Sequence, residues 1–182
     1  MLTWRRSARL VVVLATAGLT AGCFEPLYQS HPSVGGEGVQ DKFAAVQILP
    51  IEARKGTPDE RIAVGMYNAL SYSLHNGGKG APPIYQLTVI VVAKGFVATI
   101  SPTSGRPDSS ISMLTAKFRL TEIATNKTVL SDDTTVEVPY AIPGSQQRFA
   151  GSRAERDAQD RAVTIGAEAI RNRLASYFVA GT

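Results

Sequence analysis

Hydrophobic spacing first marks out a strand and a helix between residues 43 and 78. The apolar run 43–51 is interrupted by Pro50 and predicts a short strand that ends there. Thr57, Pro58 and Glu60 then have the spacing of a capping box with proline at the first helical position. Apolar side chains recur after this start at steps of three and four, and Gly77-Gly78 follows them. The pattern predicts a helix with one buried face that ends at the glycine pair.

Alternation at period two continues through the middle of the chain. Residues 84–100 are rich in β-branched side chains, with the odd positions from Tyr85 to Ala93 on one side and the even positions on the other. Gly95 suggests a bulge or bend in this strand. Residues 114–121 and 128–138 alternate in the same way around the turn 124–127, which predicts a long hairpin with one wet face.

The C-terminal segment returns to helical spacing. Ser152 and Glu155 repeat the capping-box spacing and predict the start of this helix. An apolar stripe then runs through Val163, Ala167, Ile170, Leu174 and Phe178. The predicted order is therefore β-α-β-β-β-α. Two helices that are each apolar on one stripe, with a sheet that has one wet face, pack most simply as an α+β two-layer α/β sandwich. We expect both helices to lie on a four-stranded mixed sheet.

The first 22 residues have the parts of a secretory signal peptide, and Cys23 follows them directly. A basic head precedes an apolar core, residues 10–18, that is shorter than the ~20 residues needed to span a bilayer. The sequence Leu19-Thr20-Ala21-Gly22-Cys23 resembles the lipobox of bacterial lipoproteins, with Thr20 where a large aliphatic residue is usual. The resemblance implies that Cys23 is acylated and that the chain is cut in front of it. An alternative is a soluble exported protein whose cysteine lies near the cut by coincidence.

This leader divides the chain into a signal peptide (1–22), a lipidated N-terminus and flexible tether (23–41), and a single α/β sandwich domain (42–182). Stable attachment to a membrane needs two acyl chains or more, which a diacylated Cys23 supplies. The sorting rule known for such lipoproteins retains those with Asp after the cysteine at the inner membrane. Phe24 stands there, so the rule implies the outer membrane, with the protein on its periplasmic side.

Charge and composition exclude several classes of function. The formal charge of the 182 residues is +4, but three arginines leave with the signal peptide, and 16 basic and 15 acidic residues remain. A generally basic, nucleic-acid-binding body is not supported. With Cys23 acylated, the domain has no thiol for a disulfide, a nucleophile or a zinc site.

Candidate catalytic and metal-binding residues are sparse. His31 falls in the tether and His75 at the end of the first helix, where a cation meets the helix dipole favourably. No metal-ligand spacing and no Gly-x-Ser-x-Gly elbow is present. We therefore predict no enzyme activity, no catalytic residue, no metal and no cofactor.

The basic residues of the strands and loops are the candidate ligand-binding groups. Arg106, Lys117 and Arg119 lie in a loop or on the predicted wet strand face, beside large apolar surface. Lysine and arginine in such surroundings suit the phosphates of an amphiphile. Ordinary surface charge is the alternative for each of them, as it is for Lys94 and Lys127.

These features together are similar to the lipopolysaccharide-assembly lipoprotein family, LptE, of the alphaproteobacterial type. The start of the mature chain, 23–28, resembles the Cys-Gly-Phe-x-Pro-Leu-Tyr start of such members, without the glycine. Residues 149–150, 153–155 and 170–178 are similar to their terminal helix.

The resemblance implies a non-enzymatic outer-membrane lipoprotein that plugs a β-barrel translocon (LptD-like), assists its folding and binds lipopolysaccharide on its way to the surface. Two other classes stay open. One is an auxiliary lipoprotein of an envelope phospholipid-transport complex. The other is a periplasmic hydrolase, which would depend on His75.

Overall fold

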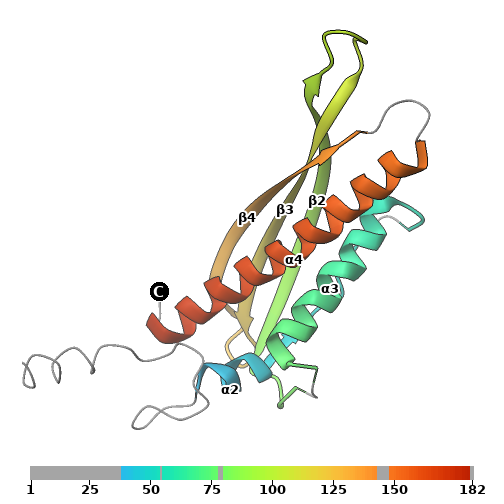
Figure 1. Ribbon diagram of the computed structural model, residues 1–182. Helices are drawn as coiled ribbons and strands as arrows, with labels where there is room; N and C mark the ends of the chain where they lie inside the picture. Colours follow the sequence, from blue (N-terminus) through green and yellow to red (C-terminus); the bar gives the residue numbers. More distant parts are fainter. Residues whose placement is uncertain (1–37, 54, 78–79, 143–147, 181–182) are drawn as a thin grey trace, which may run out of the picture.

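A long twisted sheet with two helices on one face forms the body of the protein in the computed structural model (Figure 1). The structure describes residues 38–53, 55–77, 80–142 and 148–180. The elements in chain order are α2 (Val39–Ala44), β1 (Val46–Ile48), α3 (Pro58–His75), β2 (Tyr85–Ile100), β3 (Pro107–Glu122), β4 (Lys127–Ala141) and α4 (Arg148–Ala180). The predicted α+β sandwich with a four-stranded mixed sheet is confirmed, with the short helix α2 added before the first strand.

The strands lie in the order β1-β2-β3-β4. β1 runs parallel to β2, and α3 makes the connection between them, while β2, β3 and β4 are antiparallel neighbours. Because β1 has three residues and β2 has sixteen, β1 covers only the first part of β2. We call the end of the sheet next to β1 and α2 the proximal end and the β2–β3 turn the distal end; Figure 1 shows the β2–β3 hairpin extending beyond the helices at the distal end.

The core lies between the sheet and the two helices. The predicted stripe of α4 is confirmed, since Val163, Ala167, Ile170, Leu174 and Phe178 are all buried. The predicted faces of β2 are also confirmed, with Leu87 and Val89 buried and Ile90 and Val92 exposed. Alternation along β3 buries Leu114, Ala116, Phe118 and Leu120 against the helices. The opposite face of the sheet carries no helix among the described residues and is here called the open face (Figure 1).

The predicted strand 43–51 is wrong in its first part. Residues up to Ala44 are helical, and Val46–Ile48 alone forms the strand. The helical turn places the ring of Phe43 in the core, 5.8 Å from the Phe178 ring centroid. Lys42 Nζ donates a hydrogen bond to the Phe178 carbonyl at 3.1 Å. Burial of an aromatic ring and this capping contact to α4 outweigh the weak strand preference of the segment.

Three other local predictions need correction. α4 begins at Arg148, so Ser152 and Glu155 lie inside the helix, and Glu155 accepts a hydrogen bond from Gln159 instead of capping the start. The β2–β3 ladder passes through Gly95 without a shift, and the irregularity lies between Val97 and Ile100. β4 extends past Pro139 to Ala141, which an edge strand tolerates because its outer N–H groups need no partner.

The predicted helix α3 is confirmed, and its ends are set by local geometry. Glu60 accepts a hydrogen bond from the amide of Gly56 at 2.7 Å. Asn76 and Gly77 follow the last helical residue with φ of 50° and 72°, the left-handed conformation that ends helices. Gly78 lies outside the described residues.

Candidate functional site

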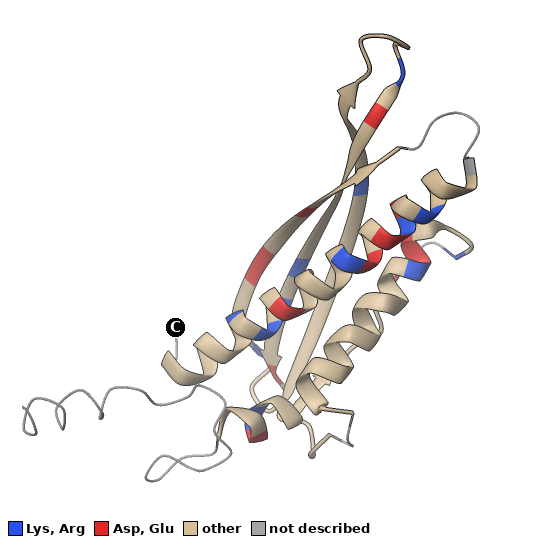
Figure 2. Cartoon of the chain, viewed as in Figure 1, with Lys and Arg blue, Asp and Glu red and all other residues tan. Residues whose placement is uncertain are grey.

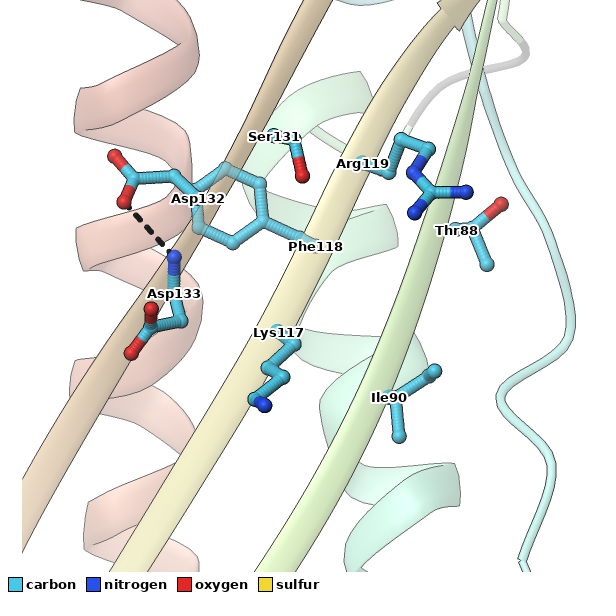
Figure 3. Close-up of a pocket in the computed structure, with 8 residues that line it drawn as sticks. All are labelled: Thr88, Ile90, Lys117, Phe118, Arg119, Ser131, Asp132 and Asp133. Atoms are coloured by element: carbon cyan, nitrogen blue, oxygen red, sulfur yellow. Dashed lines mark hydrogen bonds between the residues drawn. The ribbon is translucent and has the colours of Figure 1, made fainter. Parts of the chain in front are cut away.

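A hollow of about 400 Å³ lies on the sheet near its proximal end. Figure 3 shows the side chains around it, which come from β2, β3 and β4. The residues that line it are Thr88, Ile90, Lys117, Phe118, Arg119, Ser131, Asp132 and Asp133. The hollow contains two of the three basic residues that the sequence predicts for ligand binding.

Strand register determines which side chains meet in this hollow. Arg119 pairs with Thr88 on β2 and Ser131 on β4, so these three lie in one row across the sheet. Lys117 pairs with Ile90 on β2 and Asp133 on β4, in the next row toward the distal end. Side chains two residues apart on a strand share a face, so Lys117 and Arg119 both project from the open face.

The two cations lie in different electrostatic surroundings. In Figure 3 the Arg119 guanidinium extends over β2 toward Thr88, while Asp133 lies on β4, on the other side of Lys117. Within the described part of the chain, the side chains of Lys117 and Arg119 have no ion pair or hydrogen bond. Both side chains are exposed. Arg119 therefore presents its donors to solvent above β2, and the nearest acidic neighbour across the strands faces Lys117.

Asp132 borders the hollow but is bound elsewhere. Its Oδ2 accepts a hydrogen bond from Arg173 Nε of α4 at 2.7 Å, and its Oδ1 accepts one from the Asp133 amide at 2.9 Å. The hydrogen bond from Arg173, and next that from the Asp133 amide, lower the pKa of Asp132 below its ordinary value of 3.8. Asp132 thus ties β4 to α4, and its charge is compensated on the helix side of the sheet.

The third predicted ligand residue, Arg106, is not part of this group. It lies exposed in the β2–β3 turn, where its carbonyl accepts a hydrogen bond from the Ser101 amide at 2.8 Å. Ten residues of β3 separate it from Lys117, roughly 35 Å along an extended strand. The predicted lipidation residue, Cys23, lies outside the described residues.

Thr88, Ile90 and Ser131 are site residues that the sequence reading missed. Their membership follows from two signals: the period-two alternation places Thr88 and Ile90 on the same side of β2, and the register places Ser131 beside Arg119. The alternation was visible in the sequence, but the register was not.

The residues considered for other chemistry have structural contacts. His75 Nε2 lies 3.0 Å from the Val46 carbonyl oxygen and links α3 to β1. No group of three or more metal-ligating side chains occurs in the described ranges. No described helix has the length and apolar character to cross a membrane. Figure 2 shows basic and acidic residues interspersed along α4, where Arg161 pairs with Asp157 at 2.9 Å. The arrangement on the open face can bind an anion, through a guanidinium and an ammonium group on one strand.

Comparison with known proteins relates the fold to bacterial lipoproteins. No family model matches the sequence, and no curated protein matches it. A lipoprotein from Caulobacter crescentus has a TM-score of 0.59 and 20% identity over 78% of this chain and 96% of that chain. Rare lipoprotein B from Shewanella oneidensis has a TM-score of 0.55 and 14% identity over 74% and 96%. A lipoprotein B from Nitrosomonas europaea has a TM-score of 0.53 and 15% identity over 75% and 84%. At these identities the likeness establishes a shared fold.

Proposed function

We propose that the protein is an outer-membrane lipoprotein, anchored on the periplasmic side through acylated Cys23, that partners and plugs a β-barrel translocon and assists its assembly. In this role it helps to deliver lipopolysaccharide to the cell surface. The observation that carries the proposal is a fold shared with rare lipoprotein B in a chain whose leader ends in Ala21-Gly22, directly before Cys23. A cationic, exposed strand face supports the ligand class, since lipopolysaccharide carries phosphates and acyl chains.

The anchor is tested with Cys23→Ser. Because two or more acyl chains are needed for stable membrane attachment, this variant is expected in the soluble periplasmic fraction, while the wild-type chain sediments with outer membranes. Mass spectrometry of the mature N-terminus should show an acylated Cys23 in the wild type. A serine variant that still sediments with membranes would contradict the anchor.

The barrel partner is tested by purifying the acylated protein in a mild detergent. We expect a β-barrel protein to co-purify, and depletion of the lipoprotein to leave that barrel misassembled and lipopolysaccharide missing from the surface. Co-purification with an inner-membrane transporter, together with normal surface lipopolysaccharide after depletion, would overturn the proposal and favour the phospholipid-transport class.

Lipopolysaccharide binding is tested with two variants that make the same change in charge, Arg119→Glu in the hollow and Arg106→Glu in the distal turn. A hydrogen bond to a charged group contributes about 1.5–3 kcal/mol, so Arg119→Glu should weaken binding by about tenfold or more. Arg106→Glu should change the dissociation constant little. The reverse order would place the ligand at the distal turn and contradict a site at Lys117 and Arg119.

A further inference from the structure

The open face changes character along the strands. Its proximal rows carry Arg119 and Lys117 on β3, with hydroxyl side chains beside Arg119. Distal to Lys117 the face becomes largely apolar, with Val92 and Phe96 each 48% exposed and Met113 and Ile111 half-buried. The exceptions are Lys94 and Glu137, which flank Met113 in one row, and the threonine pair Thr115 and Thr135, joined at 3.1 Å. The face therefore has a cationic proximal end and a largely apolar distal end.

The proximal end has cation charge available for a ligand. Lys117 and Arg119 are two residues apart on one strand and share a face, so their charges repel and an anion between them lowers that repulsion. Asp132 is already bound to Arg173, and Asp133 faces Lys117 from the β4 side. A planar guanidinium forms paired hydrogen bonds with phosphate oxygens, and Thr88 and Ser131 add hydroxyl donors in the same row. These groups suit a phosphate held above β2 and β3.

The distal end offers apolar surface of acyl-chain length. From Lys117 to Ile111 the strand advances six residues, roughly 20 Å. Along this face of β2 the order is Ile90, Val92, Lys94 and Phe96, and no charged residue occurs between Lys94 and Arg106. Each Å² of apolar surface that an acyl chain covers contributes about 25 cal/mol. A ligand with a phosphate at one end and alkyl chains at the other matches the face in order and in sign of charge.

We propose that the open face binds an anionic, acylated amphiphile in one direction, with its phosphate at Lys117 and Arg119 and its acyl chains running distally over Val92 and Met113 to Phe96. This inference rests on the ligand class of the proposed function. It adds the orientation of the ligand, with the phosphate at the proximal end of the face and the acyl chains at the distal end. A bound amphiphile covers the exposed apolar side chains and neutralises the cation pair together.

The direction is tested with tryptophan reporters, because Trp4 of the signal peptide is the sequence's one tryptophan and the mature chain has none. Phe96→Trp reports on the distal end, and Gln86→Trp, one row proximal to Arg119 on β2, is the matched control. The probe is phosphatidic acid with bromine atoms on its acyl chains, which quench nearby tryptophan fluorescence. The acylated protein is used in a detergent without bromine.

We expect strong quenching of Trp at position 96 and weak quenching at position 86, relieved by unlabelled lipopolysaccharide. Adding Lys117→Gln and Arg119→Gln to the distal reporter should raise the lipid concentration needed for half-quenching by about tenfold or more. Circular dichroism of each variant checks that the fold is kept, and Val92→Trp is a second distal reporter should Phe96→Trp fail to fold.

Other outcomes separate this inference from the proposed function. Stronger quenching at position 86 than at 96 overturns the direction, and equal quenching at both overturns a fixed orientation. Lipopolysaccharide binding with no quenching at either reporter places the ligand on another surface, which overturns the inference and leaves the proposed function standing. If no barrel protein co-purifies with the acylated protein and the protein does not bind lipopolysaccharide, the proposed function is instead refuted.

Discussion

The packing of the two long helices can be tested at two glycines, one with free space beside its Cα and one without. Gly65 lies in α3, where an added Cβ would meet Val163 Cγ1 at 3.7 Å, an ordinary van der Waals distance. Gly166 is buried in α4, where a Cβ would meet Met66 Cε at 3.2 Å and Leu114 Cδ2 at 3.6 Å. At Gly166, α4 therefore packs tightly against Met66 of α3 and in ordinary contact with the sheet, whereas an added Cβ at Gly65 would have room.

The expected magnitudes follow from these distances. Alanine is favoured over glycine in a helix interior by about 0.8–1.0 kcal/mol, so Gly65→Ala should stabilise the domain by about 0.5–1 kcal/mol and raise its Tm by roughly 2–4 °C. Gly166→Leu adds atoms where a single carbon is already tight. Overpacking costs about 1–3 kcal/mol, of which the gain in helix propensity offsets less than about 1 kcal/mol.

Urea unfolding of the Cys23→Ser chain, followed by circular dichroism, measures both changes. The two variants should shift the midpoint in opposite directions with unchanged m, since the surface exposed on unfolding stays the same. Gly166→Ala is the intermediate control. A destabilised Gly65→Ala, or a Gly166→Leu variant as stable as the wild type, would refute the described packing of α3 and α4 on the sheet.

Three further predictions concern contacts that join one element of the fold to the next. Phe178→Ala should lower the free energy of unfolding in urea by about 3–5 kcal/mol, because it removes a buried ring in edge-to-face contact with Phe43; a loss below about 1 kcal/mol would contradict this packing. Asp132→Asn removes a carboxylate whose pKa is lowered by Arg173. Its half-exposed ion pair should contribute less than about 1 kcal/mol above pH 3.8, and the difference from wild type should shrink as the pH falls through the folded-state pKa. A stability difference between Asp132→Asn and the wild type that grows as the pH falls would contradict this prediction. Gly77→Ala, at φ 72°, should destabilise by about 1–2 kcal/mol in thermal unfolding, and an unchanged Tm would mean that the turn rearranges.

The spacing of apolar residues and the positions of proline and glycine in the sequence predicted most of the fold. The stripe of α4 and the alternation of β2 and β3 are properties of residues two, three or four apart, so they could be read without the tertiary structure. The structure at the start of the domain could not be predicted from such local spacing. Phe43 sits in an apolar run that looks like a strand, and a ring and a capping lysine contact at the far end of α4 keep it helical. The start of α4 was misplaced because the capping-box spacing also occurs inside a helix.

The features of the candidate site can also be separated into those set by the sequence and those set by the tertiary structure. The sequence by itself determined that Lys117 and Arg119 share an exposed strand face, because side chains two positions apart on a strand project to the same side. It also carries Cys23 and the leader on which the proposed anchor rests. Only the tertiary structure decided that Arg106 lies far from them, that Thr88 and Ser131 lie beside Arg119, and that Asp132 turns toward Arg173. The reason is that strand register and helix placement depend on contacts between segments distant in the chain, and local patterns do not encode those contacts.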